Sequence, residues 1–214
     1  MIVVRKRRWQ QQLGDPAPIG YIGFGTAAVL SAFILTGWIK GTTGAAMLWG
    51  TALWTGGLAV LLAAVLAFVR GAHFEVLFFG MYGSMWLSFA VMVVLPVANL
   101  SRLGEVSQSG LALLHLVYSI FTVFVLLACP LRSAVLTLAV LFLFATFVLN
   151  SIDHAVMQWR GISGDTIFST DNTLQIVSGY CCLVGGTLLV YYGAAIVNGW
   201  PVFRPPLAEV SMEN

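Results

Sequence analysis

Six long runs of mostly apolar residues, none interrupted by Asp, Glu, Lys or Arg, make up most of this chain. They cover residues 16–39, 41–69, 76–101, 106–131, 133–152 and 172–203. Each run can hold a membrane-spanning helix of about 20 residues. The runs are continuous, whereas strands of a membrane β-barrel would alternate apolar and polar residues. The pattern therefore predicts an all-α polytopic membrane protein with six transmembrane helices.

The ends of the runs divide the chain into three parts. A cytoplasmic segment over 1–15 precedes a six-helix transmembrane domain over 16–203, and 204–214 form a cytoplasmic tail. Within the domain we predict helices over residues 18–39, 46–69, 75–97, 110–129, 133–152 and 172–198. The longer connections over 98–109 and 153–171 are placed outside, and the second is expected to be a solvated loop or a short interfacial helix.

Composition agrees with this division, because only 8% of the residues are charged and 59% are hydrophobic, which excludes an ordinary soluble surface. A net charge of +2 implies no nucleic-acid partner. With the N-terminus inside, seven of the ten basic residues are cytoplasmic: Arg5, Lys6, Arg7, Arg8, Arg70, Arg132 and Arg204. This asymmetry predicts that both termini are cytoplasmic and that the protein is a multi-pass protein of the plasma membrane.

The predicted spans contain few side chains that could take part in catalysis or proton transfer. His115 is the one ionisable group in the middle of a predicted span, and it is interpreted as a satisfied structural histidine slightly ahead of a proton carrier. No set of nucleophile, base and metal ligands can be assembled, so we expect no enzyme, no metal and no cofactor. A pathway lined by hydroxyls and apolar side chains suits a small weak acid or a neutral solute better than a metal ion.

Two motifs stand out. Asp15-Pro16-Ala17-Pro18-Ile19-Gly20 is typical of a helix start, because Asp caps helices and proline fits the first turn. Tyr82-Gly83-Ser84-Met85-Trp86 lies in the third span, where its hydroxyls suit either helix packing or a polar step in a pathway. Glycines and alanines form stripes on the first, second and sixth helices, and we favour packing within one bundle over a subunit interface.

These motifs resemble those of the acetate uptake transporter family, which includes the bacterial acetate–succinate permease and fungal acetate and ammonia-export proteins. The resemblance implies hexamers in which each protomer has its own pathway, narrowed by Phe24, Tyr82 and Leu138. Asp15 stands where the family has Asn, and Thr55, in Trp54-Thr55-Gly56-Gly57, stands where it has Tyr.

The predicted function is therefore a transporter or channel for small monocarboxylates, acetate first and succinate also considered, coupled to protons. Its partners would be the carboxylate, protons, the lipid bilayer and further copies of the chain. Ser84, Trp86 and Thr55 are candidates for polar positions in the pathway or for packing. Two alternatives stay open, an exporter of ammonia or ammonium and a membrane sensor without transport.

Overall fold

A computed structural model describes residues 14–97, 108–161 and 172–203, and all regular structure in these ranges is helical. The elements are α2 (Ala17–Leu35), α3 (Gly41–Thr51), the π-helix η1 (Ala52–Ala59), α4 (Val60–Arg70), α5 (His73–Val97), α6 (Gln108–Ala128), the 3₁₀ turn η3 (Cys129–Leu131), α7 (Ala134–Trp159) and α8 (Thr173–Asn198). Apart from Gly14 and Asp15, the predicted cytoplasmic segments 1–15 and 204–214 lie outside the described residues.

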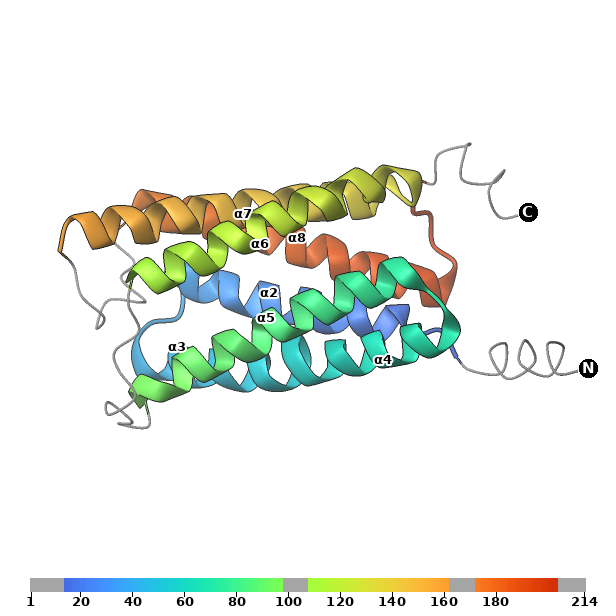
Figure 1. The fold of residues 1–214 in the computed structure, drawn as a ribbon, viewed down its shortest axis with the longest axis horizontal. Helices are drawn as coiled ribbons and strands as arrows, with labels where there is room; N and C mark the ends of the chain where they lie inside the picture. The colour runs from blue at the N-terminus through green and yellow to red at the C-terminus, as the bar shows by residue number, and fades with distance from the viewer. Residues whose placement is uncertain (1–13, 98–107, 162–171, 204–214) are drawn as a thin grey trace, which may run out of the picture.

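Six of the helical stretches in the described ranges are long and apolar enough to cross a membrane, which confirms the predicted number of spans. They are Ala17–Leu35, Ala46–Arg70, His73–Met92, Gln108–Leu131, Ala134–Trp159 and Thr173–Asn198. The second is built from α3, η1 and α4, which follow one another without a break. α2 begins and α8 ends at the same end of the bundle, called the terminal end below, and the opposite end is called the distal end (Figure 1).

Short-range signals in the sequence fix where several helices begin and end. The hydroxyl of Ser133 accepts hydrogen bonds from the backbone of Val135 and Leu136 at the start of α7, and the side chain of Asn172 accepts one at the start of α8. Gly71 and Gly199 follow α4 and α8 with φ of 77° and 67°, a left-handed conformation that favours glycine.

Small residues bring α2 and α8 into close contact along much of their length. A Cβ atom added to Gly25 would lie 2.6 Å from the carbonyl oxygen of Gly186, and one added to Gly186 would lie 2.9 Å from that of Gly25. Neither position can therefore accept a larger residue without moving the backbones apart. The glycines of these two helices pack within the bundle, as the sequence analysis favoured.

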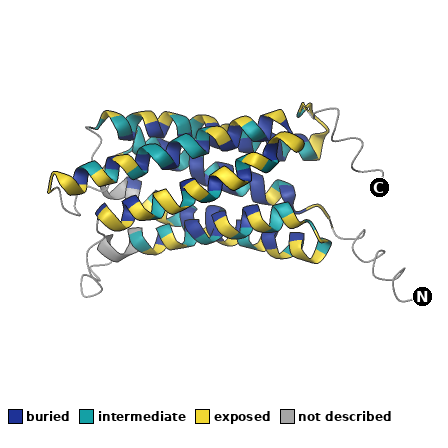
Figure 2. Cartoon of the chain, turned by 45° about the horizontal axis from the view of Figure 1, so that its top comes forward, coloured by how far each residue is buried: buried dark blue, intermediate teal, exposed yellow. Residues whose placement is uncertain are grey.

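α5 meets α6 and α7 differently, through long side chains rather than through close backbones. Rings of Tyr82 on α5, Phe121 on α6 and Phe147 on α7 bridge the space, with centroids 5.3 and 6.1 Å from that of Tyr82. The outward faces carry exposed apolar side chains such as Phe68 and Leu127, 73% and 71% exposed, as lipid contact requires (Figure 2). The space for a pathway therefore lies in the interior between α2, α5, α6 and α7.

Three boundaries differ by four residues or more from those predicted. α3 begins at Gly41 rather than at 46. α2 ends at Leu35 rather than at 39, because a turn with Gly37 at φ 78° reverses the chain. α7 continues to Trp159, so Asp153 and His154 belong to a helix and not to a loop. The side chain of Asp153 is only 1% exposed, and the hydrogen bond that it accepts from Asn172 offsets part of the cost of burying it in the helical bundle.

Candidate functional site

An aromatic cluster closes the middle of the bundle. Phe24 on α2 is stacked on Tyr82 on α5, with ring centroids 4.8 Å apart and an angle of 22° between the planes. Phe78 meets Tyr82 edge to face at 4.8 Å, and Trp86 meets Phe24 edge to face at 6.1 Å. Phe24 and Tyr82 are 1% and 0% exposed. The structure thus brings together two of the three residues expected at the constriction.

The hydroxyl of Tyr82 is held in place by a chain of two hydrogen bonds. Thr122 donates to the carbonyl oxygen of Tyr118 at 2.6 Å, so its oxygen is free to accept the hydrogen of Tyr82 at 2.7 Å. All of these groups lie on α5 and α6, and Thr122 is fully buried. The contact fixes the tilt of the Tyr82 ring and therefore the face that it presents to Phe24.

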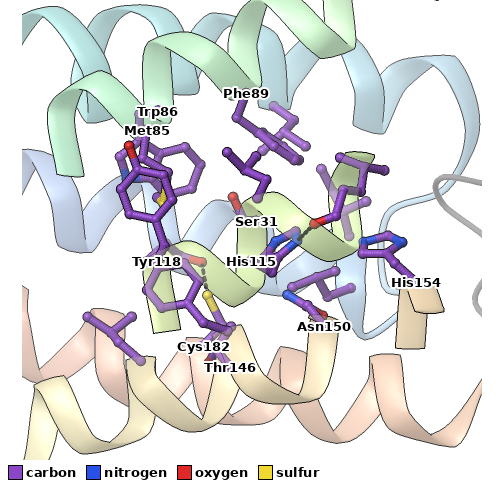
Figure 3. A pocket seen from close by; sticks show the side chains of 18 of the residues that line it. Ser31, Met85, Trp86, Phe89, His115, Tyr118, Thr146, Asn150, His154 and Cys182 are labelled. Carbon is purple, nitrogen blue, oxygen red and sulfur yellow. Dashed lines mark hydrogen bonds between the residues drawn. The ribbon is translucent and has the colours of Figure 1, made fainter. Parts of the chain in front are cut away.

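A cavity of about 80 Å³ extends from this cluster toward the distal end (Figure 3). Because one water needs roughly 10–15 Å³ on this measure, the space suits a molecule the size of a short carboxylic acid. Phe24, Trp86 and Phe147 line it at the cluster. Leu35, Asp153 and Gln175 line it at the distal end. Phe24 and Leu35 lie eleven residues apart on α2, so the lined stretch is about 16 Å long.

Two histidines stack at the distal part of the cavity. The rings of His115 on α6 and His154 on α7 have centroids 5.3 Å apart (Figure 3). Nδ1 of His115 lies 2.8 Å from the carbonyl oxygen of Leu111, and Nδ1 of His154 lies 2.7 Å from Oε1 of Gln108. The Leu111 carbonyl can only accept, so the His115 ring carries its hydrogen on Nδ1 and leaves Nε2 as an acceptor.

Further polar side chains of α7 and α8 surround the same part of the cavity. Ser178 donates to Oδ1 of Asn150 at 2.7 Å, and the Asn172 amide donates to the carboxylate of Asp153. Gln175 is 3% exposed, lines the cavity, and has no hydrogen-bond partner for either Nε2 or Oε1 within the described ranges. Nε1 of Trp86, at the aromatic end, is likewise buried without a partner there.

The third residue expected at the constriction lies elsewhere. Leu138 is 49% exposed and is absent from the lining of the cavity. The α7 residue of that size beside the cavity is Leu143, which is 2% exposed. Five residues on a helix are about 140° apart, so the two leucines point in nearly opposite directions. The structure does not bring Leu138 to Phe24 and Tyr82.

Of the polar candidates, only Trp86 lines the cavity. The hydroxyl of Ser84 donates to the carbonyl oxygen of Met81 at 2.8 Å, and that of Thr55 donates to Thr51 at 2.7 Å. Both bonds stay within one membrane span, so neither of them links two helices.

The motif at the first helix lies at the terminal end, away from the cavity. The carboxylate of Asp15 accepts a hydrogen bond from the backbone of Ala17 at 3.1 Å and lies 3.8 Å from the guanidinium of Arg70. Pro16 is the N-cap of α2 and Pro18 lies in its first turn, and a Cβ added to Gly20 would lie 2.4 Å from the ring of Phe79. Asp15 thus lies one residue before the N-cap, from where it accepts the first N–H of the helix, and it pairs with a counter-charge that the sequence did not reveal.

No group of three or more His, Cys, Asp and Glu side chains that could hold a metal ion occurs in the described part of the chain. Asn150, Asp153, His154 and Gln175 were missed by the sequence reasoning. The available signal was a spacing of three and four residues, which aligns Asn150, Asp153 and His154 along one side of a helix.

Comparisons with known proteins agree with this architecture. The model of the GPR1/FUN34/yaaH family matches residues 4–199. Protein alcS of Aspergillus fumigatus is 26% identical over 97% of this chain and 79% of its own length. The succinate-acetate/proton symporter SatP of Escherichia coli K12 is 27% identical over 67% of this chain and 73% of its own. A solved structure of the bacterial acetate channel SatP has a TM-score of 0.73 at 22% identity, covering 88% of this chain and 94% of that one.

Proposed function

Because this chain belongs to the GPR1/FUN34/yaaH family, we propose that it transports small monocarboxylates across a membrane, with acetate first among them. The relative named a succinate-acetate/proton symporter supports the substrate class. In this chain the observation that carries the proposal is the Phe24–Tyr82 stack beneath a cavity of carboxylic-acid size. The stack is the constriction that selects small solutes.

Proton coupling follows from the cost of moving an anion through such a passage. The rings of Phe24, Tyr82 and Phe78 offer no charge to compensate a carboxylate, whose transfer from water into an apolar site costs several kcal/mol. A monocarboxylic acid with a pKa near that of a Glu side chain, about 4.3, is partly neutral at mildly acidic pH. Moving the acid with its proton removes most of that cost.

The test is flux by the purified full-length protein in liposomes. Labelled acetate should enter faster than into empty liposomes, and an inward proton gradient should accelerate entry. If acetate does not enter while ammonium does, the protein is an exporter of the kind considered as the alternative. If neither solute moves, the membrane-sensor alternative replaces transport.

In the proposed arrangement the protein lies in the plasma membrane with both termini in the cytoplasm, and six-helix protomers assemble as hexamers. Arg70 and Arg132 lie at the terminal end, and the excess of basic residues there supports its cytoplasmic location. Single cysteines at Gln11 and Gly104 test the orientation with a reagent that does not cross membranes. Labelling of Gly104→Cys and protection of Gln11→Cys in intact cells is the expected result. The reverse result would mean that the N-terminus lies outside the cell.

A further inference from the structure

The Gln175 side chain is an unusual group to find facing a cavity within a membrane protein. It is 3% exposed, and neither atom of its amide has a partner in the part of the chain that the structure describes. Buried polar groups are nearly always paired, because an unpaired one loses its hydrogen bonds to water without replacement. An amide left in this state beside a cavity indicates a ligand that completes it.

The polar side chains around the same part of the cavity bond to one another and not to Gln175. Ser178, one turn along α8, donates to Asn150. Asp153 accepts from Asn172, and the ring of His154 is hydrogen-bonded to Gln108. Gln175 therefore keeps both a donor, Nε2–H, and an acceptor, Oε1, unpaired beside the cavity that it lines.

A primary amide presents these two groups side by side, and that pattern discriminates between the forms of a small acid. A neutral carboxylic acid presents a carbonyl acceptor beside a hydroxyl donor and forms two hydrogen bonds with the amide. A carboxylate has only acceptors, so one of its oxygens would face the acceptor Oε1 and be repelled by it. An ammonium ion has only donors, so one of its N–H groups would face the donor Nε2–H and be repelled in the same way.

Titratable groups other than the acid itself also face the cavity, and none of those in the described residues carries a fixed positive charge that would favour the anion. Asp153 and His154 lie on α7, and His115 on α6 presents an acceptor nitrogen because its Nδ1 atom carries the hydrogen. Tyr118 on α6 and Cys182 on α8 complete the set. No Lys or Arg lines the cavity among the described residues, so no fixed positive charge there compensates an anion.

We propose that Gln175 binds the neutral, protonated form of a short monocarboxylic acid at the distal end of the cavity. Nε2–H donates to the acid carbonyl oxygen, and Oε1 accepts from the acid hydroxyl. This step rests on the proposed function, and it adds the recognition of the protonated form. The proton stays on the acid, so no protein group gains or loses one.

The experiment measures acetate uptake by the full-length protein in liposomes between about pH 5 and pH 7, a range around the pKa of a carboxylic acid. KM is expressed as the concentration of neutral acid. For the parent protein this KM should stay constant with pH. Gln175→Leu should raise it roughly 5- to 100-fold through the loss of two neutral hydrogen bonds, with kcat nearly unchanged.

Two further measurements make the result specific. Acetamide, a neutral molecule with the same donor and acceptor pattern, should compete with acetate in the parent and lose that effect in Gln175→Leu. Gln175→Glu keeps a donor beside an acceptor only while its carboxyl is protonated, so its KM for the neutral acid should rise with pH. Thr187→Val is the matched control on α8, because the Thr187 hydroxyl is exposed and bonds only within its helix.

The outcomes separate the two proposals. If the parent transports acetate while Gln175→Leu keeps its KM, or if acetamide does not compete, Gln175 does not bind the acid and only this inference fails. If the parent transports no acetate, the proposed function itself fails. Elution as a single folded species during size-exclusion chromatography shows that Gln175→Leu is intact, and removal of an unpaired buried amide favours that result.

Discussion

Replacing Phe24 by Ala tests whether the aromatic stack selects substrates by size. The side chain is 1% exposed and touches the rings of Tyr82, Phe78 and Trp86, at centroid distances of 4.8, 5.9 and 6.1 Å. Its removal joins new space to a cavity that it already lines. We expect butyrate to enter faster relative to acetate, because the ring no longer blocks the longer chain.

The structure also sets the magnitudes. Truncation of a buried Phe costs about 3–5 kcal/mol, a large part of a total stability of about 5–15 kcal/mol. Phe24→Leu removes less volume and serves as the milder variant. One methylene group in an apolar pocket is worth about 1–3 kcal/mol, and about 1.4 kcal/mol is a factor of ten in rate, so the ratio of butyrate to acetate flux should rise roughly tenfold in Phe24→Ala.

The assay is paired flux of labelled butyrate and acetate, normalised to folded protein in the same liposomes. Leu138→Ala is the matched control, since Leu138 lies on the outward side of α7 and is 49% exposed. It should leave the ratio unchanged. An unchanged ratio in well-folded Phe24→Ala, or an equal change in Leu138→Ala, would refute the assignment of the constriction to Phe24.

Three further predictions concern other contacts. A double-mutant cycle of Tyr82→Phe and Thr122→Val should give a coupling of about 0.6 kcal/mol and at most about 1.7 kcal/mol in unfolding measurements, the range of hydrogen bonds inside membrane proteins; zero coupling would show that the bond contributes nothing. Asp15→Asn keeps an acceptor for the N–H of Ala17 but removes the charge beside Arg70, and should change stability by less than about 1 kcal/mol, with any difference vanishing in high salt; a larger loss would contradict this. Gln175→Leu should raise the thermal midpoint without ligand, by removing an unpaired amide that costs about 1–3 kcal/mol, and a lower midpoint would mean that the amide is paired.

Much of the fold follows from the sequence because its causes are local. Uninterrupted apolar runs fix the number of spans, and small residues such as Gly25 and Gly186 mark where two backbones meet. The π-helix η1 is not evident from a helical period. Its Gly56 and Gly57 lie against Trp86 and Leu87, where added Cβ atoms would come within 2.7 and 2.4 Å of those side chains, so contacts with another helix shape it.

Only part of the candidate site could be predicted from the sequence, because some of its contacts join residues that are far apart along the chain. Phe24 and Tyr82 lie in recognisable motifs, and the fold brings them together. From the sequence alone, Asp153 is expected at the end of a span, since a charged residue that follows an apolar run is usually exposed to water. Its partner Asn172 caps the next helix, nineteen residues along the chain, and only the packed bundle shows that the carboxylate is buried and bonded.

The two proposed filters lie on different parts of the bundle. Phe24 and Tyr82, on α2 and α5, act on the width of the solute, whereas Gln175, on α8, acts on its protonation state. Gly179, one turn from Gln175, lies against Leu35 and Thr36, so Gln175 is roughly 16 Å or more from Phe24 along the α2 axis. Residues so far apart that share no partner contribute independently to free energy. A change at the constriction can therefore alter which acid passes without altering the requirement that it carry its proton.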